Sequence, residues 1–277
     1  MPESLPIATA LTIIITVMVS LRGFKDDAFR EKLIFDPHAI LAFKEYHRLV
    51  SAALLHLDAN HLFGNMLTLF LFGRSIEAVF GAEMFLVIYL VSIVGGDLLS
   101  LWLHRHHDYR ALGASGGVCG ILFAWILLFP GGGVGMFFIP ISIPGWLYAL
   151  GYLVYSFFAL KHGWGNVGHD AHIGGAMMGL LLAAFLKPQA VVANPWLFAG
   201  MLTLGSVIFL YLWKNPLMLP LKSFLPGREA RRPAKPAPGS GPSEAAVDAV
   251  LEKVSRAGLN SLTPKERSIL QSAAKRK

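Results

Sequence analysis

Three short polar stretches interrupt the apolar runs of this sequence, and each contains side chains suited to nucleophilic chemistry. His61 and Asn65 are four residues apart, so on a helix they share one face. Ser115 and His172 each stand among glycines in two further runs. Because a polar residue inside an apolar helix is costly, these four residues are the first candidates for function.

The combination of a hydroxyl with an imidazole predicts a nucleophile and its base. An imidazole activates a serine when it takes the hydroxyl proton across about 2.6–3.2 Å. Glycine lacks the side chain that would hold two helices apart, so the helices carrying Ser115 and His172 could reach this distance. The flanking glycines are Gly113 and Gly116 near the serine, and Gly175 and Gly179 near the histidine. Taken singly, such glycines also indicate ordinary helix packing, and a membrane serine usually bonds to a backbone carbonyl.

The composition places these residues in a membrane. The chain has 277 residues, of which 55% are hydrophobic and 15% charged, and its mean hydropathy is +0.56. A soluble domain carries about 25% charged residues. Residues 111–160 contain no Asp, Glu, Lys, Arg or His. This run is long enough for two crossings at about 20 residues each, so the sequence predicts an all-α, polytopic membrane protein.

Seven apolar segments are candidate transmembrane helices. They cover residues 5–22, 60–80, 84–103, 112–129, 146–160, 170–186 and 195–213. Segments two, four and six run in the same direction through the membrane, so their polar starts lie at one depth. The pattern therefore predicts one site that holds a serine, a histidine and an amide.

Polar residues outside this site have plainer interpretations. The connection over residues 23–55 is too charged to cross a bilayer and is expected to form a structured loop at the membrane surface. Arg74 and Glu77 lie near the end of the second segment, where long side chains can reach the interface. His56 is expected near the site as a structural hydrogen-bonding residue. The histidines expected to be solvated in a charged loop are His104, His106 and His107.

The last 64 residues differ in charge from the rest of the chain. They hold 13 basic and 5 acidic residues, a net of +8, whereas the first 213 hold 11 basic and 12 acidic, a net of −1. This distribution excludes a nucleic-acid footprint on the body and favours contact of the tail with anionic lipid headgroups. Residues 214–242 contain 7 of the 16 prolines and are expected to form a linker.

Residues 243–277 are expected to form a small helical hairpin, whose partner the sequence does not identify. Ser243 can cap its first helix and Gly258 can end it. Thr263 and Glu266 have the spacing of a capping box at the start of the second helix.

Several other chemistries are excluded by the sequence. The single cysteine, Cys119, cannot form an internal disulfide or a multi-thiolate metal site. The His-Glu-x-x-His motif of zinc proteases is absent. Asp97 follows two glycines, but a second intramembrane aspartate in a Tyr-Asp setting, which an aspartyl protease would need, is missing. Asp170 is two residues from His172, which places it on another side of the helix, so it is interpreted as non-catalytic.

Taken together, these motifs resemble the rhomboid family of intramembrane serine proteases over about residues 5–187. The residues that carry the resemblance are His61, Asn65, Gly113-Ala114-Ser115-Gly116, Ala171-His172, Gly175 and Gly179, with Arg48, Gly73, Glu77, Gly81, Pro140 and Pro144 in agreement. The resemblance implies a six-helix transmembrane catalytic core over residues 1–187. Residues 188–213 would then add a seventh helix.

The resemblance also implies roles for the site residues. Ser115 would attack the scissile carbonyl, and His172 would take its proton and later protonate the leaving amine. The amide of Asn65, His61 and the backbone N–H of Ser115 would stabilise the oxyanion. Substrates would be transmembrane proteins cut within or beside their membrane helices in the lipid bilayer. Neither a metal nor an organic cofactor is implied, and the expected location is the inner membrane of a bacterial cell.

Two positions depart from the family pattern, and one alternative function stays open. The first loop has His47 before Arg48 where the family often has tryptophan, and Cys119 replaces an aromatic residue that often stacks on the catalytic imidazole. The alternative is a catalytically silent, rhomboid-like protein that binds or escorts membrane proteins. Such proteins lack the serine or the histidine, whereas Ser115 and His172 are both present.

Overall fold

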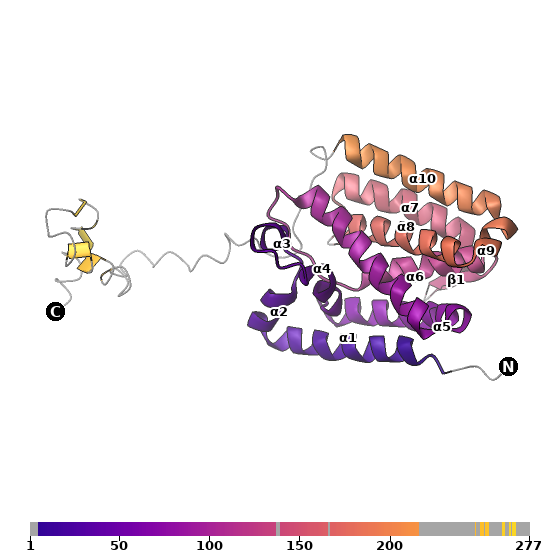
Figure 1. Cartoon of the computed structure of the whole chain (residues 1–277), viewed down its shortest axis with the longest axis horizontal. Helices are drawn as coiled ribbons and strands as arrows, with labels where there is room; N and C mark the ends of the chain where they lie inside the picture. Colours follow the sequence, from indigo (N-terminus) through magenta and orange to yellow (C-terminus); the bar gives the residue numbers. More distant parts are fainter. Residues whose placement is uncertain are drawn as a thin grey trace. The chain divides into compact units, whose positions relative to one another are not determined.

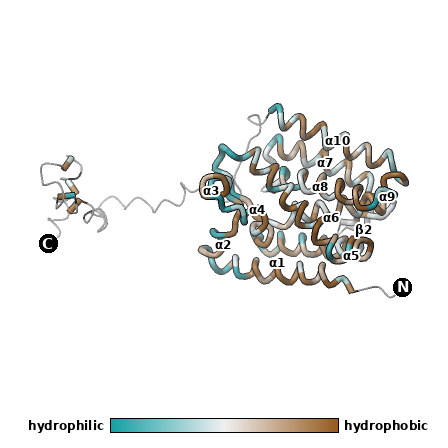
Figure 2. Tube along the Cα trace, viewed as in Figure 1, coloured by the Kyte–Doolittle hydropathy of each residue, from teal (hydrophilic) through white to brown (hydrophobic). Residues whose placement is uncertain are grey.

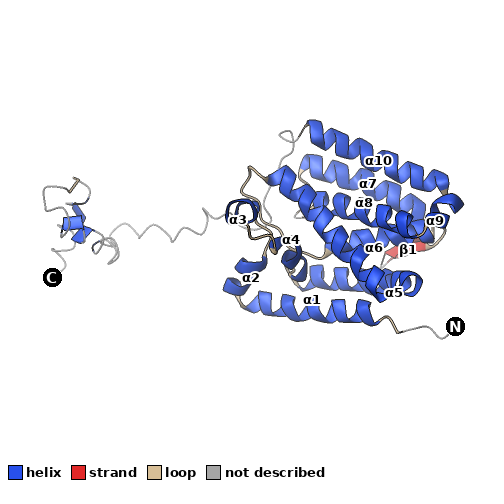
Figure 3. Cartoon of the chain, viewed as in Figure 1, coloured by secondary structure: helices blue, strands red, loops and turns tan. Residues whose placement is uncertain are grey.

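The computed structural model describes residues 5–136, 139–165 and 167–215, together with ten residues between 247 and 269. The chain forms two compact units, Met1–Gly227 and Arg228–Lys277. The described part of the first unit is almost entirely helical, with one short pair of strands (Figures 1 and 3). The fold is therefore of the all-α membrane class that the sequence predicts.

Four helices in the described residues are long and apolar enough to cross a membrane. They are α1 (Ile7–Lys25), α5 (Ala59–His104), α8 (His169–Leu186) and α10 (Pro195–Lys214). Apolar residues colour most of the length of these helices in Figure 2. Large apolar side chains such as Ile14, Phe185 and Phe209 lie exposed on their outer faces, as expected of surfaces that contact lipid. The chain is thus a multi-pass integral membrane protein.

The helix α5 has 46 residues and contains a break at Gly81. A continuous helix of this length would extend about 69 Å, about twice the thickness of the hydrocarbon core. The φ of Gly81 is +82°, a left-handed conformation that glycine adopts without strain. The predicted segments 60–80 and 84–103 therefore lie on opposite sides of this break.

The helix α6 (Ser115–Leu128) lies at the centre of the bundle, packed between α5 and α8. Eleven of its 14 residues are buried, which explains why it is apolar on every side. At 14 residues it is shorter than a full crossing at about 20 residues. It begins three residues later than the predicted segment 112–129, at Ser115.

The remaining elements complete the bundle. Residues 130–145, predicted as a connection, contain an antiparallel pair of strands, β1 (Gly133–Met136) and β2 (Ile139–Pro144). The helix α7 (Gly145–His162) follows, and α9 (Pro188–Ala193) joins α8 to α10. The helices α7, α8 and α10 lie side by side in Figure 1, and α10 packs against both of the others.

The carboxylate of Glu77 is buried, whereas the sequence predicted a side chain that extends to the membrane interface. It accepts hydrogen bonds from the backbone N–H groups of Ala8 and Thr9 at 2.9 and 2.8 Å. It also accepts one from the Thr9 hydroxyl at 2.7 Å. The first N–H groups of a helix have no partner within that helix, so Glu77 caps α1 and attaches it to α5. Arg74 is exposed.

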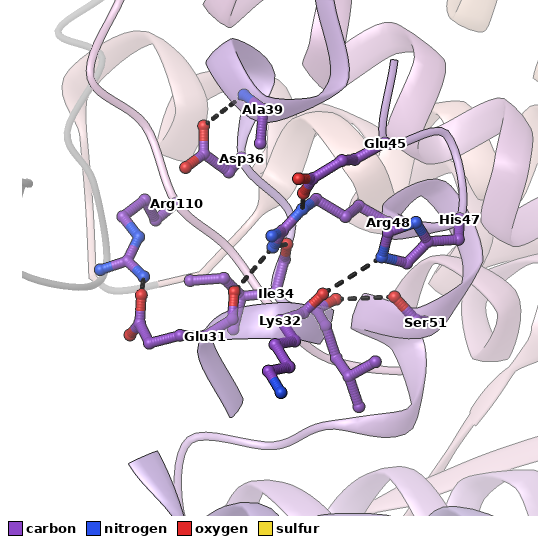
Figure 4. A network of polar contacts seen from close by, with 11 residues as sticks. Glu31, Lys32, Ile34, Asp36, Ala39, Glu45, His47, Arg48, Ser51 and Arg110 are labelled. Atoms are coloured by element: carbon purple, nitrogen blue, oxygen red, sulfur yellow. Dashed lines mark hydrogen bonds and ion pairs between the residues drawn. The ribbon is translucent and has the colours of Figure 1, made fainter. Parts of the chain in front are cut away.

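The first loop is structured, as the sequence predicts. It contains α2 (Asp27–Leu33), α3 (Pro37–Phe43), α4 (Arg48–Ser51) and the 3₁₀ turn η1 (Ala52–Leu54). The buried guanidinium of Arg48 donates to the carboxylate of Glu45 at 2.6 Å and to the carbonyl oxygens of Glu31 and Ile34 at 2.8 Å (Figure 4). His47 lies beside it and bonds to the carbonyl of Lys32. Arg48 thus joins three segments of the loop.

In the second unit, the predicted capping box is present. Thr263 and Glu266 exchange hydrogen bonds, with the Thr263 N–H donating to the carboxylate at 2.8 Å and the Glu266 N–H donating to the threonine hydroxyl at 3.4 Å. Lys253 forms an ion pair with the same carboxylate at 2.8 Å. Ser243, Gly258 and most of the linker 214–242 lie outside the described residues.

Candidate active site

Ser115 and His172 meet where the helices α6 and α8 (His169–Leu186) begin. Ser115 is the first residue of α6, and His172 lies in the first turn of α8. The distance between the serine Oγ and the histidine Nε2 is 2.6 Å, across 57 residues of sequence. His172 is 8% exposed. A hydroxyl donating to a ring nitrogen at this distance has the geometry that base-activated nucleophilic attack needs.

Glycines allow α6 and α8 to approach so closely. A Cβ on Gly175 would overlap the carbonyl oxygen of Gly116, and a Cβ on Gly179 would overlap that of Gly120. These contacts are with backbone atoms, which cannot rotate away. The glycine pattern therefore serves helix packing, and this packing brings the serine and the histidine together.

The other ring nitrogen of His172 has a partner that the sequence analysis missed. The Tyr152 hydroxyl, on α7, lies 2.8 Å from Nδ1. The Cys119 Sγ lies 3.2 Å from the same hydroxyl. The signal available in the sequence was a tyrosine inside the charge-free segment 146–160, but aromatic residues in such a segment are usually packing residues.

Gly113 and His56 shape the approach to the serine. Gly113 has a φ of +137°, which other residues rarely adopt, and a Cβ there would come within 2.8 Å of His61. The His56 Nε2 accepts the N–H of Ala114 at 3.4 Å, and its Nδ1 lies 3.0 Å from the Ser20 hydroxyl. Burial, with a smaller contribution from His61, lowers the pKa of His56 to about 3. His56 is therefore neutral and acts as a hydrogen-bond acceptor for the loop before Ser115.

A cavity of about 440 Å³ opens beside the serine. Its lining includes His61, Asp97, Gly113, Ser115 and His172. Asn65 lies one turn after His61 on α5, and its buried amide nitrogen has no hydrogen-bond partner among the described residues. A buried donor without a partner is costly. Asn65 is not among the residues that line the cavity.

Asp170 and His104 form a second buried polar pair. The Asp170 carboxylate accepts a hydrogen bond from the His104 Nε2 at 3.0 Å, and the His104 ring stacks on Tyr109 with centroids 3.4 Å apart. The prediction that His104 is solvated is therefore wrong, because His104 is the buried last residue of α5. His106 is exposed and His107 half-buried.

His169, the other histidine at the start of α8, does not contact the serine. Its ring packs edge-to-face against His172, with centroids 5.8 Å apart, and against Tyr155. Of the two histidines, His172 is the one whose ring nitrogen meets Ser115. Within the described parts of the chain, no group of three His, Cys, Asp or Glu side chains could hold a metal ion.

Part of the chain is similar in sequence to known proteins. Residues 44–189, which are 146 of the 277 residues, match the Rhomboid domain. The chain is 32% identical to Rhomboid protein 1, mitochondrial, of Saccharomyces cerevisiae over 50% of its own length and 41% of that protein. It is 30% identical to RHOMBOID-like protein 12, mitochondrial, of Arabidopsis thaliana over 51% of its length and 46% of that protein.

A bacterial relative has a similar level of identity. The chain is 29% identical to the Rhomboid protease GluP of Bacillus subtilis over 63% of its own length and 33% of that protein. The chain thus spans less than half the length of each of these three relatives.

Proposed function

The chain belongs to the rhomboid family, and we propose that it is an intramembrane serine endopeptidase whose substrates are transmembrane proteins. The observation that carries this proposal is the contact of 2.6 Å between the Ser115 Oγ and the His172 Nε2. Both residues line the cavity and lie on membrane helices. Polar side chains in such helices are costly in free energy, so a paired hydroxyl and imidazole there indicate a function.

The proposed reaction is acyl transfer through Ser115. His172 takes the hydroxyl proton at Nε2 while the Oγ attacks the carbonyl carbon of the scissile peptide bond. The tetrahedral intermediate collapses as the imidazolium gives its proton to the leaving amine, and the C–N bond breaks. A water molecule then attacks the acyl-enzyme with His172 again as the base, which releases the new carboxyl end and restores the serine.

The oxyanion of the intermediate needs hydrogen-bond donors that are in place before the reaction. We assign this role to the backbone N–H of Ser115, the Asn65 amide and His61. The free amide nitrogen of Asn65 and the position of His61 in the cavity wall support the assignment. The start of α6 at Ser115 adds the positive end of a helix dipole.

The architecture proposed for this activity is a six-helix catalytic core over residues 1–187. Residues 188–213 would add a seventh crossing, which contains most of α10. The stacking of Trp213 on Trp102, with ring centroids 5.1 Å apart, supports the attachment of α10 to this core. Residues 214–242 would be a linker and 243–277 a separate hairpin. The proposed location is a bacterial inner membrane.

The test is cleavage of a transmembrane substrate by the purified full-length chain in liposomes. We expect cleavage by the wild type and none above background by Ser115→Ala or His172→Ala, because each removes one member of a pair that acts as a unit. Ser142→Ala and His162→Ala are matched controls, since both residues are exposed and outside the cavity. Labelling of Ser115 by a fluorophosphonate distinguishes a protease from a silent, substrate-binding member of the family.

A further inference from the structure

We propose that Tyr152 is a positioning residue for His172, and that it replaces the carboxylate of a conventional triad with a neutral phenol. This inference rests on the proposed function, since it concerns the base of that reaction. Its basis is a chain of contacts through three helices: Ser115 Oγ to His172 Nε2 at 2.6 Å, His172 Nδ1 to Tyr152 hydroxyl at 2.8 Å, and that hydroxyl to Cys119 Sγ at 3.2 Å.

The direction of each hydrogen bond follows from the chemistry. To receive the serine proton, Nε2 must be unprotonated, so the single proton of the neutral imidazole is on Nδ1. The Nδ1–H must then donate to the Tyr152 oxygen. The phenol proton in turn needs an acceptor, and the Cys119 sulfur lies within reach as a weak one. The other tautomer would place a proton on Nε2 and leave Ser115 without a base.

Among the residues that the structure describes, the hydrogen-bond partner of His172 Nδ1 is the Tyr152 hydroxyl, and no carboxylate bonds to it. The nearest candidate, Asp170, accepts from His104 at 3.0 Å. His169 contacts the His172 ring edge-to-face, and its own nitrogens have no hydrogen-bond partner among the described residues. When the imidazolium forms during attack, its Nδ1–H therefore keeps Tyr152 as its acceptor, and the His172 side chain that makes this bond is buried.

Packing holds Tyr152 in place for this role. Its ring stacks on Tyr148, one turn earlier on α7, with centroids 5.6 Å apart and an interplanar angle of 12°. It also packs against Phe123 of α6, at 6.2 Å. Cys119, at the position where the family often has an aromatic residue, leaves room on α6 for the tyrosine that comes from α7.

The experiment compares Tyr152→Phe with Tyr148→Phe in the full-length protein. Both variants remove one phenol oxygen and keep the stacked rings, but only Tyr152 contacts His172. We expect Tyr152→Phe to lower kcat about three- to tenfold, the effect of one neutral hydrogen bond, with KM unchanged. The rate of fluorophosphonate labelling should fall by the same factor, and Tyr148→Phe should match the wild type in both.

A spectroscopic measurement tests the tautomer directly. Nitrogen chemical shifts of ¹⁵N-histidine-labelled protein, with the His172 signal assigned by its loss in His172→Ala, distinguish Nδ1–H from Nε2–H. We expect the Nδ1–H form in the wild type and in Tyr148→Phe, and a mixture of both forms in Tyr152→Phe. Cys119→Ala should shift the population in the same direction, whereas Cys119→Ser, which supplies a better acceptor, should restore it.

The outcomes separate this inference from the proposed function. The positioning role would be overturned if a folded Tyr152→Phe protein had the same kcat, labelling rate and His172 tautomer as the wild type. Equal losses in Tyr152→Phe and Tyr148→Phe would also overturn it, because packing would then explain both. A wild type that neither cleaves nor labels would contradict the proposed function, while the nitrogen shifts would still decide the tautomer.

Discussion

The carboxylate of Asp170 accepts a hydrogen bond from the Nε2 of His104 at 3.0 Å, although 66 residues separate them in the sequence. Both side chains are 2% exposed. The pair joins the first turn of α8 to the last residue of α5. Since His172 lies two residues after Asp170, this contact also fixes where α8 places its imidazole.

We predict that Asp170→Ala lowers the free energy of unfolding by about 1–3 kcal/mol, because it leaves a buried imidazole N–H without an acceptor. Asp170→Asn keeps an acceptor oxygen and should recover part of this loss. Unfolding in detergent measures both variants, and Asp108→Ala is the control, since Asp108 is exposed in the nearby loop. Equal stability of Asp170→Ala and wild type would show that the pair does not stabilise the bundle.

The Asn65 amide nitrogen has no hydrogen-bond partner among the described residues. We therefore expect its removal to slow the reaction without changing the fold. Asn65→Ala should lower kcat by about 10²–10³, the effect of one lost oxyanion donor, and should leave some cleavage because two other donors remain. Substrate affinity should change little. Steady-state kinetics in liposomes check this, and a change confined to KM would assign Asn65 to substrate binding instead.

Gly179 should tolerate no side chain. Its Cβ would overlap the Gly120 backbone, so Gly179→Ala must separate α8 from α6. We expect a loss of stability of about 1–3 kcal/mol from overpacking, and lower activity because the distance from Ser115 to His172 increases. Gly151→Ala on α7 is the matched control, since a Cβ there meets no atom within 4 Å. It should be neutral or slightly stabilising.

We predict that His56 makes the folded protein less stable in acid. Its pKa is lowered from 6.5 to about 3 in the folded protein, chiefly by burial. Its contribution to stability is therefore complete above pH 6.5 and falls as the pH drops toward 3, by up to about 1.4 kcal/mol per pH unit. Protonation would also place an N–H on Nε2 against the N–H of Ala114.

Unfolding at pH 7.5 and pH 5.5 tests this prediction. The decrease in stability between the two pH values should be smaller in His56→Gln than in the wild type, whatever the stability of the variant at pH 7.5. His106→Gln, at an exposed position, should keep the wild-type decrease. An unchanged decrease in His56→Gln would contradict the assignment to His56.

Much of the site could be predicted from the sequence, because each motif that contributes to it is a short stretch of neighbouring residues. Long apolar runs with few charges predicted the membrane helices, since a charge in the bilayer core is costly. Helix geometry alone predicts that His61 and Asn65 share one helix face. It also predicts that the glycines around Ser115 and His172 allow two helices to pack closely. The capping box of Thr263 and Glu266 is likewise a contact between residues three positions apart.

Other features were decided only by the tertiary structure. The contacts of Tyr152 with His172, His104 with Asp170 and Glu77 with Thr9 join residues 20, 66 and 68 positions apart. A helix that is apolar on every side gives no sign of which face turns inward, so its rotation and its neighbours are set by packing. The sequence by itself thus predicted a bundle of apolar membrane helices, and it singled out Ser115 and His172 as a candidate pair. The packing of the helices decided what supports that pair, because buried polar groups bond to whichever partners the assembled bundle places beside them.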